Sequence, residues 1–446
     1  MDGHVIPQPE VHVLPHGDPG VDSVGTIRPS EQPFLAKGFG YPAYIWIDTS
    51  RPAALAVAED RHFNRLCTER SACMFRRWFT AALGALALLL LTPGSLPAAS
   101  AAEAPAPLRV MTRNLYLGAD LAPVLAAGNP QALVAAVTAV YANVQATNFP
   151  ERAEALADEI AGSDPHLVGL QEAVLWRSQT PAGPGSATHV EYDFLQILLD
   201  KLASRGKHYA AVATVTVGSD FEAPRSLPGG GLQDIRLTDR DVLLARTDLP
   251  ARVFSVANPQ AARFQAHVPI CRPLFGCVPP GNVPIRVERG WVAADATVRG
   301  NTARVVTTHL EPASPTVQEA QADELLTGPL NTTLPTVLLG DLNSAAGGVG
   351  ATPGTTTQTY NHLLAADFTD AWTATRPGNP GFTCCQAANL INPTSSLAQR
   401  IDYVLFRGSG VTALASNRVG DTQADRTPSG LWPSDHAGVR SVLLLR

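Results

Sequence analysis

The alternation of apolar and polar residues along the chain predicts short buried strands and several helices. Apolar runs of three to six residues, such as 337–339, have the length of strands buried in a sheet. Helices are predicted where Ala, Leu and Val recur at helical spacing, with Asn129-Pro130 and Phe149-Pro150 marking two of the starts. No repeat interrupts this pattern, and no second domain is apparent in it.

The predicted elements lie between residues 108 and 445. Strands are predicted at residues 108–111, 166–172, 208–217, 241–245, 252–256, 285–298, 302–308, 337–339, 400–406 and 439–445. We interpret 241–245 and 252–256 as a strand pair, and 285–298 and 302–308 as a hairpin. Helices are predicted at residues 130–145, 151–161, 193–204 and 315–327. Long loops are predicted at residues 218–238, 257–284, 347–357 and 374–399.

Residues 74–101 have the three parts of a secretory signal peptide. Met74-Phe75-Arg76-Arg77 is a basic segment, 81–91 is a short apolar run, and Ala99-Ser100-Ala101 is a cleavage site of the A-x-A type. The apolar run is short for a membrane span. Because signal peptides begin at the initiator methionine, we interpret residues 1–73 as an upstream extension from a misassigned start codon. A cytoplasmic tail before a membrane anchor is the alternative. The mature domain is then residues 102–446, secreted and without a stable membrane span.

Charge and cysteine content restrict the partners and ligands. Residues 1–101 hold 8 of the 33 basic and 9 of the 39 acidic residues, so the mature part has 25 and 30 and a net charge of −5. Strong nonspecific attraction to nucleic acid or anionic lipid is not expected. Cys271 and Cys277 flank a small loop that a disulfide would close, whereas Cys384 and Cys385 are adjacent, and cross pairing between the two sets stays open. No His or Cys has the spacing of a zinc site.

Polar residues recur where predicted strands end. Asp341 and Asn343 follow the strand 337–339 and, two residues apart in an extended segment, point to the same side. Ligands of α/β sheets bind at such carboxyl ends. A turn is the simpler interpretation of Gly340-Asp341-Leu342-Asn343 alone, because Gly, Asp and Asn are turn formers. The same pattern recurs elsewhere, at Asn114, Glu172, His309, Asp402 within a strand, and Asp435 with His436 before one.

This ordered set resembles the endonuclease/exonuclease/phosphatase superfamily, which includes pancreatic-type deoxyribonucleases, abasic-site endonucleases, bacterial sphingomyelinases and inositol-polyphosphate phosphatases. The resemblance covers about residues 109–446, and its segments are Arg113-Asn114, Leu170-Gln171-Glu172, Thr308-His309-Leu310, Gly340-Asp341-Leu342-Asn343, Arg400-Ile401-Asp402-Tyr403 and Ser434-Asp435-His436. Each segment is weakly specific alone, but their order is specific. The resemblance implies an α/β fold, a four-layer α/β sandwich with two mixed β-sheets packed face to face, helices outside, and the active site at one edge.

The resemblance also implies roles for these residues. Glu172 is expected to be the central metal ligand, with Asn114 and Asp435 assisting. Asp341 and Asn343 are expected to hold the attacking water. His309 is expected to form a hydrogen bond to the phosphate. His436, oriented by Asp402, is expected to be the general base or an electrostatic partner; either Asp341 or His436 takes the proton of the water. The implied cofactor is Mg2+, or Mn2+ or Ca2+ in its place, and hard cations do prefer carboxylate and water ligands.

Two further residues are candidates for substrate binding. Arg289 has a side chain suited to clamping a phosphate, although an ion pair with Glu288 at a hairpin edge explains it equally well. Asp241 stands where many relatives have an Asn, which leaves its role open.

These observations predict an exported, metal-dependent phosphoesterase, expected to be a monomer. Its substrate is a phosphodiester, either a nucleic acid or a phospholipid head group as in sphingomyelinases. The alternatives are a phosphomonoesterase of the inositol-phosphatase type and a catalytically inactive binding module of the same fold.

Overall fold

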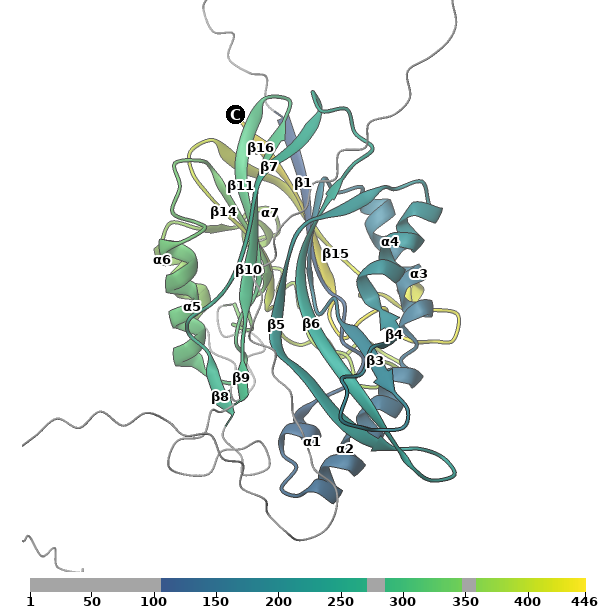
Figure 1. The fold of residues 1–446 in the computed structure, drawn as a ribbon. Coiled ribbons are helices and arrows are strands. Elements are labelled where there is room, and N and C mark those ends of the chain that lie inside the picture. The colour runs from purple at the N-terminus through teal and green to yellow at the C-terminus, as the bar shows by residue number, and fades with distance from the viewer. Residues whose placement is uncertain (1–105, 271–284, 347–357) are drawn as a thin grey trace, which may run out of the picture. The chain divides into compact units, whose positions relative to one another are not determined.

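Two mixed β-sheets pack face to face in the computed structural model, which describes residues 106–270, 285–346 and 358–446 (Figure 1). The first sheet has eight strands, in the order β15 (Val411–Val419), β16 (Gly438–Leu445), β1 (Ala106–Asn114), β2 (Leu167–Gln171), β6 (Leu232–Arg246), β3 (Leu175–Gln179) and β4 (His189–Asp193), with β5 (Tyr209–Ser226) paired to β6. The second has six, in the order β13 (Thr369–Asp370), β14 (Asp402–Arg407), β12 (Thr336–Asp341), β11 (Asn301–His309), β10 (Gly290–Val298) and β7 (Phe254–Arg263). Strands β8 (Val268–Ile270) and β9 (Ile285–Val287) form a separate ribbon.

Helices cover the outer faces of both sheets. The first sheet carries α2 (Pro130–Ala146), α3 (Phe149–Ser163) and α4 (Phe194–Ser204), and the second carries α5 (Pro315–Thr327) and α6 (Gln358–Ala365) (Figure 1). Two helices are short: α1 (Ala122–Leu125) precedes α2, and α7 (Ala371–Thr375) follows β13. Helices, sheet, sheet and helices make four layers, which confirms the predicted four-layer α/β sandwich.

The apolar runs of the sequence are explained by burial of the strands on both faces. In β12, Val337 and Leu339 belong to the core between the sheets, whereas Leu338 belongs to the core under α5 and α6. In β6, Leu243 faces the core between the sheets, and Val242 faces the core under α2 to α4. Because successive side chains alternate between faces, each central strand needs apolar residues in succession.

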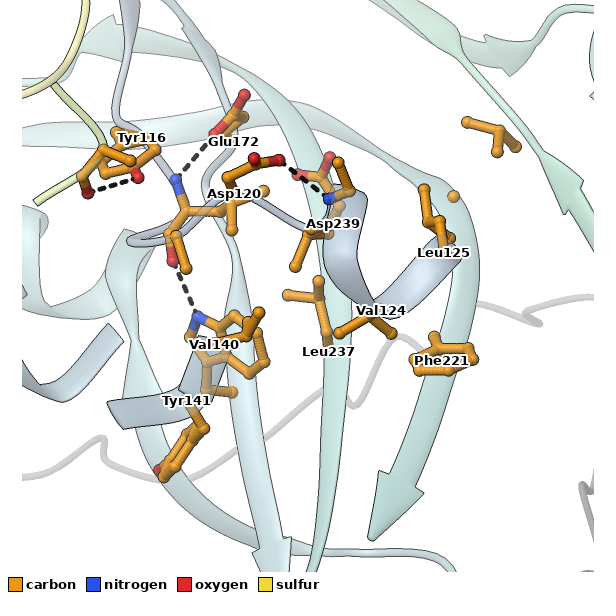
Figure 2. Close-up of a pocket in the computed structure, with 18 of the residues that line it drawn as sticks. Tyr116, Asp120, Val124, Leu125, Val140, Tyr141, Glu172, Phe221, Leu237 and Asp239 are labelled. Atoms are coloured by element: carbon orange, nitrogen blue, oxygen red, sulfur yellow. Dashed lines mark hydrogen bonds between the residues drawn. The ribbon is translucent and has the colours of Figure 1, made fainter. Parts of the chain in front are cut away.

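The predicted helices and the hairpin at Arg299-Gly300-Asn301 are confirmed, but the predicted loop at residues 218–238 is wrong. That stretch belongs to a long hairpin of β5 and β6, whose turn contains Gly229, Gly230 and Gly231, all at positive φ. Gly218 and a register shift between Val217 and Phe221 interrupt the strand pattern, so the sequence of this stretch resembles that of a loop. The hairpin forms one wall of a cavity whose other wall includes α1 and α2 (Figure 2).

The predicted pairing of 241–245 with 252–256 is also wrong. Residues 241–245 lie in β6, which pairs with β2 and β5, whereas β7 pairs with β10 in the other sheet. A short connection carries the chain from one sheet to the other, and partners distant in sequence decide the pairing. Strands β3, β4 and β15, which we did not predict, lie at or near the edge of the first sheet.

Several predictions concern residues outside the described ranges. They are the extension 1–73, the signal peptide 74–101, the cysteines Cys271 and Cys277, and the loop 347–357. Among the described residues, no helix is long and apolar enough to cross a membrane.

His166, just before β2, makes the stability of the fold sensitive to acid. Its Nδ1 accepts a hydrogen bond from the backbone N–H of Arg109 at 3.1 Å, and its ring stacks on Phe254 with the centroids 5.0 Å apart. Burial, assisted by the positive charge of Arg109, lowers the pKa of His166 from 6.5 to about 4. The unfolded chain therefore binds more protons between these values, so the free energy of unfolding falls as the pH falls from 6.5 to 4. The loss from this one group is at most about 3 kcal/mol.

We expect His166→Gln to remove this part of the pH dependence, because a glutamine can still accept the N–H of Arg109 but does not titrate. The measurement is the free energy of unfolding in urea at several pH values between 4 and 7. His208→Gln is the matched control, because His208 is exposed, and it should keep the wild-type slope. An unchanged slope in His166→Gln contradicts the role given to His166.

Candidate active site

Strand register gathers the predicted site residues at one edge of the two sheets. In the second sheet His309 pairs with Asp341, and Asp341 pairs with Asp402, so three polar residues stand in a row across β11, β12 and β14. Strands β11 and β12 end there, whereas the antiparallel β14 begins there. In the first sheet Asn114 pairs with Gln171 at the ends of β1 and β2, with Glu172 next. The two rows come together because the sheets pack face to face.

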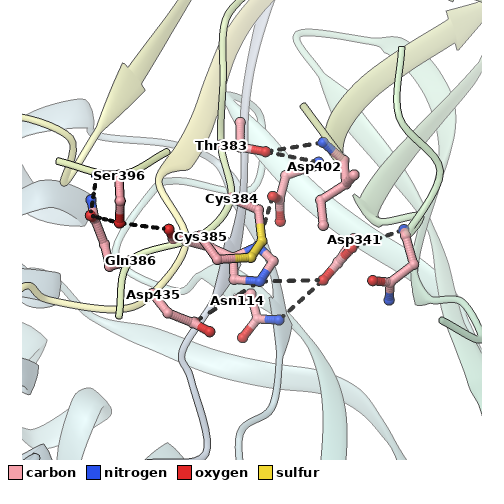
Figure 3. The surroundings of a disulfide bond; sticks show 12 residues. Asn114, Asp341, Thr383, Cys384, Cys385, Gln386, Ser396, Asp402 and Asp435 are labelled. Atoms are coloured by element: carbon pink, nitrogen blue, oxygen red, sulfur yellow. Dashed lines mark hydrogen bonds and ion pairs between the residues drawn. A yellow bond between two sulfur atoms is a disulfide. The ribbon is translucent and has the colours of Figure 1, made fainter. Parts of the chain in front are cut away.

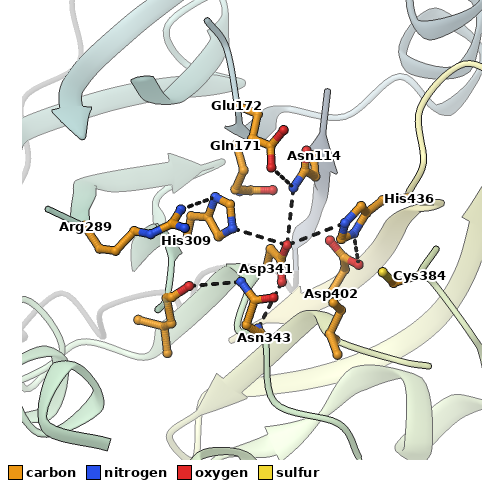
Figure 4. Close-up of polar contacts among 12 residues, drawn as sticks. Asn114, Gln171, Glu172, Arg289, His309, Asp341, Asn343, Cys384, Asp402 and His436 are labelled. Carbon is orange, nitrogen blue, oxygen red and sulfur yellow. Dashed lines mark hydrogen bonds and ion pairs between the residues drawn. The ribbon is translucent and has the colours of Figure 1, made fainter. Parts of the chain in front are cut away.

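His436 is fixed on one side of this site by Asp402 (Figure 4). Its Nδ1 lies 2.8 Å from Oδ2 of Asp402, and both residues are buried. The backbone of His436 is held as well: its N–H donates to Oγ of Ser434 at 3.1 Å, and its carbonyl accepts from the Arg113 guanidinium. Burial would lower the pKa of His436, but the carboxylates of Asp402, Asp435 and Asp341 outweigh it and raise this pKa well above 6.5.

Asp341 is the centre of the polar network (Figure 4). Its Oδ2 accepts a hydrogen bond from Nδ2 of Asn114 at 3.2 Å and lies 3.5 Å from Nε2 of His309 and 3.8 Å from Nε2 of His436. Its Oδ1 accepts from the backbone N–H of Asn343 at 2.9 Å. Burial, together with the charge of Asp402, raises the pKa of Asp341 to about 7. The carboxyl group thus faces two imidazoles and an amide.

The turn after β12 is what aims these side chains. Gly340 has φ +149°, and a Cβ there would overlap the carbonyl oxygen of Thr308, so only glycine fits. Asn343 has φ 48° and donates from Nδ2 to the carbonyl of Leu310 at 2.9 Å. Gly340 and Asp341 thus belong to the end of β12, the chain bends at Asn343, and the functional role of this segment stays a prediction.

His309 is a neutral imidazole with a defined tautomer. Burial and the positive charges of Arg289 and His436 lower its pKa well below 6.5. Its Nδ1 lies 3.0 Å from Nη1 of Arg289. Because a guanidinium only donates, Nδ1 must accept and the proton must be on Nε2, which faces Asp341.

Arg289 is turned into the site, which contradicts the alternative of an ion pair with Glu288. Glu288 instead pairs with Arg263 at 2.6 Å, and Nε of Arg289 lies 3.9 Å from the buried Glu311. Asp241 is fully buried, and within the described ranges neither of its carboxyl oxygens has a hydrogen-bond partner. Burial and the neighbouring charge of Asp239 raise the pKa of Asp241 well above its usual range.

Glu172 and Asp435 offer carboxylate oxygen atoms that fit a hard divalent cation, whereas Asn114, the third predicted ligand, turns its amide nitrogen toward Glu172. Glu172 accepts hydrogen bonds from Nδ2 of Asn114 at 3.2 Å and from the backbone N–H of Leu117 at 2.7 Å. In the described part of the chain no Lys or Arg forms an ion pair with Glu172 or Asp435, and the charge nearest to Asp435 is His436, whose Nε2 lies 3.9 Å from its Oδ1. Oδ1 of Asn114 accepts the N–H of Tyr116 at 2.9 Å, so its amide nitrogen faces the carboxylates.

A bound divalent cation would supply charge neutralisation to a phosphoryl group in this site. A second group with ligand atoms within 4.8 Å of one another is Asp341, Asp402 and His436, adjacent to the first. Cys384 and Cys385 also lie near His436, but the structure joins them in a disulfide, which makes them poor ligands (Figure 3).

All ten predicted site residues thus lie at this edge or directly behind it, but the sequence reasoning missed several neighbours. Glu311 supports Arg289, and Gln171 links the sheets by accepting from Thr112 and donating to Thr307. Gln171 belongs to a segment already recognised, Leu170-Gln171-Glu172, and Glu311 directly follows another, Thr308-His309-Leu310, which was the available signal. Cys384, which bridges to the backbone of His436, carried no such signal because it lies in a loop distant in sequence.

Comparison with known proteins identifies the family of this chain. A model of the Endonuclease/Exonuclease/phosphatase family matches residues 140–436, more than half of the chain. No curated protein matches this chain. Among solved structures, a family protein from Bacteroides vulgatus is 16% identical, with 76% of this chain and 99% of that chain covered and a TM-score of 0.44. One from Beutenbergia cavernae is 24% identical, with 76% and 72% covered and a TM-score of 0.43. A mannosyl-6-phosphatase from Bacteroides thetaiotaomicron is 17% identical, with 76% and 100% covered and a TM-score of 0.42.

The family match extends from α2 to His436 and includes Glu172, His309, Asp341 and Asp402. It confirms the resemblance drawn from the ordered sequence segments. The chain belongs to the Endonuclease/Exonuclease/phosphatase family, whose members are metal-dependent phosphoester hydrolases.

Proposed function

We propose that this hydrolase is an exported phosphodiesterase that cleaves a P–O bond with water activated at Asp341, Asn343 and His436. The observation that carries the proposal is the buried line Asp402–His436–Asp341, which faces the carboxylates of Glu172 and Asp435. Hydrolysis of a phosphate ester needs a positioned nucleophile on one side and neutralised phosphoryl charge on the other. The Asp402–His436–Asp341 line would position the nucleophile. The carboxylates of Glu172 and Asp435 would serve to neutralise the phosphoryl charge through a bound cation.

The Asp341 and His436 pair orients the water, and the Asp341 carboxylate accepts its proton, because the raised pKa of His436 keeps that imidazole charged. Oδ2 of Asp341 and Nε2 of His436 are 3.8 Å apart, so a water molecule beside them reaches both groups. Nδ1–H of His436 donates to Asp402, which fixes the ring and leaves Nε2 directed at Asp341. The Asn343 side chain lies beside the same carboxylate and completes the seat of the water.

His309 and Arg289 act on the phosphoryl oxygens. The neutral His309 presents Nε2–H toward the centre of the site, and Arg289 fixes that tautomer through Nδ1. A donor held in place before the reaction stabilises the negative charge that develops on the phosphoryl group. Glu172 with Asp435 would hold the divalent cation, and the Asn114 amide would orient Glu172.

The small number of cations near the site favours a diester over a monoester. A diester carries one negative charge and a monoester about two near neutral pH. Of the residues lining the adjacent cavity, Arg289 is the single base, whereas five are acids: Asp120, Glu172, Asp239, Glu288 and Asp435. Polyanionic inositol phosphates are therefore a poor fit. The inactive binding module is disfavoured because the whole set of candidate site residues is present.

Export is part of the proposal and rests on the signal-peptide pattern of residues 74–101. We expect the native protein to begin at Ala102, because the A-x-A site ends at Ala101. Mass spectrometry of the protein isolated from its own cells measures the amino terminus directly. A peptide from residues 1–73 would contradict the interpretation of that segment as untranslated.

Removing the cation should abolish activity. We expect EDTA to stop hydrolysis and Mg2+ to restore it, measured on an aryl phosphodiester, plasmid DNA, RNA, sphingomyelin and inositol phosphates. Glu172→Gln should raise the Mg2+ concentration needed for half-maximal activity by about tenfold or more, since a ligand charge is lost. Glu319→Gln in α5, away from the site, should keep the wild-type value. Absence of EDTA-sensitive turnover on every substrate would support the inactive module instead.

Asp402→Asn should lower kcat by about 10²- to 10⁴-fold, because an amide neither fixes the His436 tautomer nor stabilises its charged form. The chain offers a matched control in Asp323, an exposed carboxylate whose Oδ1 lies 2.8 Å from Nε2 of His362 on the surface. Asp323→Asn should leave kcat unchanged. The measurement is kcat as a function of pH, and an unaltered profile in Asp402→Asn contradicts the positioning role.

A further inference from the structure

A largely apolar cavity of about 570 Å³ opens beside the active site, between the α1–α2 segment and the β5–β6 hairpin (Figure 2). Its walls include Val124 from α1, Val140 from α2, Trp176 from β3, Phe221 from β5 and Leu237 from β6. This volume lies within the range of sites for small molecules. An apolar space of this size is not needed by the chemistry at Asp341 and His436.

The cavity is continuous with the phosphoester site. Glu172, Asp239, Arg289 and Asp435 line it as well, and Figure 2 shows Glu172, Asp120 and Asp239 together at one end with Val124, Leu237 and Phe221 beyond them. A ligand phosphate at Glu172 therefore has its substituent directed along apolar walls.

The charges of the lining exclude a long polyanion. Five acids, of which Glu288 is paired with Arg263, and one arginine line the cavity, so a second or third phosphate of a nucleic acid would meet carboxylates more often than cations. The deeper walls consist mainly of Val, Leu, Ile and Ala side chains, with Trp176, Phe221 and Tyr141 among them, so few hydrogen-bond partners face the edges of a nucleobase. An aliphatic chain meets both conditions.

We propose that this cavity binds the aliphatic chain of an amphiphilic phosphodiester, so that the substrate is a lipid rather than a nucleic acid. The inference rests on the phosphodiesterase function proposed above and assigns its substrate class. The chain enters beside α1, where Leu125 is 37% exposed, and the phosphodiester lies against Glu172 and Arg289. Burial of each methylene then adds to affinity.

Binding of n-alkyl phosphonates tests the binding of an alkyl chain in this cavity directly. Their C–P bond is not a phosphoester bond, so a phosphoesterase does not hydrolyse them during the titration. Isothermal titration of the full chain with Mg2+ and the methyl, butyl, hexyl and octyl compounds should show affinity rising about two- to fourfold per methylene. In parallel, kcat/KM should rise along a series of alkyl p-nitrophenyl phosphates. A dinucleotide, tested beside them, should be a poorer substrate than the octyl ester.

Two variants link the effect to the cavity. Leu125→Glu places a charge at the exposed rim, and Ala223→Phe fills the space from β5; each should reduce the ratio of octyl to methyl affinity at least tenfold. The control is Leu414→Glu, in which an apolar side chain that is 53% exposed on β15, outside the cavity lining, is replaced; it should keep the wild-type ratio. Thermal unfolding confirms that each variant is folded, and the rim variant retains the test if Ala223→Phe does not fold.

The outcomes separate this inference from the proposed function. Chain-length dependence that is lost in Leu125→Glu supports the cavity assignment. EDTA-sensitive hydrolysis with no dependence on chain length, or a preference for the dinucleotide, overturns the lipid assignment and leaves the phosphodiesterase function standing. Chain-length-dependent binding without hydrolysis of any ester supports an apolar ligand site but overturns the enzymatic function.

Discussion

Six carboxyl groups lie close together at the edge of the two sheets, and holding them there is the physical constraint on which the site depends. They belong to Glu172, Asp239, Asp241, Asp341, Asp402 and Asp435. Burying like charges costs free energy unless dipoles and cations offset them. The fold supplies fixed donors, the amide of Asn114 and the N–H groups of Leu117 and Asn343, and two cationic side chains, Arg289 and His436. The offset is partial, because burial still raises the pKa of Asp239 and of Asp341 to about 7. A bound divalent cation would offset the remaining negative charge.

Two buried arginines hold the loops that carry these groups. Arg152 donates to the carbonyls of Leu115, Tyr116, Thr147 and Pro433, so it ties the loop after β1 to the segment before β16. Arg113 forms an ion pair with Glu159 and donates to the carbonyl of His436. A guanidinium suits this task because its donors form a rigid planar fork. The positions of Leu117 and His436 therefore depend on the packing of α3 against the first sheet as well as on the strands.

Much of the site was predictable because its residues follow strands whose apolar runs are visible in the sequence. Asn114, Glu172, His309 and Asp341 each come where such a run stops, and burial on both faces is what made the runs conspicuous. Gly218 and a register shift hid the part of β5 and β6 that lies within residues 218–238, although 208–217 and 241–245 were predicted as strands. Strand β7 was joined to the wrong partner because sheet pairing depends on residues distant in sequence. The sequence could not show whether Arg289 pairs with Glu288. Only the fold brings Arg263 to Glu288 and Glu311 to Arg289. The sequence did not predict the cavity for the same reason: only the fold brings its lining residues together.

The loop that follows β1 connects the chemistry to the cavity. Within it Leu117 donates its N–H to Glu172 at 2.7 Å and accepts at its carbonyl from Nε1 of Trp176 at 3.0 Å. One residue thus positions both a cation-binding carboxylate and an aromatic side chain of the apolar wall. Contacts that a substrate makes far from its phosphorus are useful to catalysis when they orient the reacting bond. A chain seated against Trp176 would align its phosphodiester with Glu172 through a single rigid connection, so the apolar part of the substrate would contribute to the rate as well as to affinity.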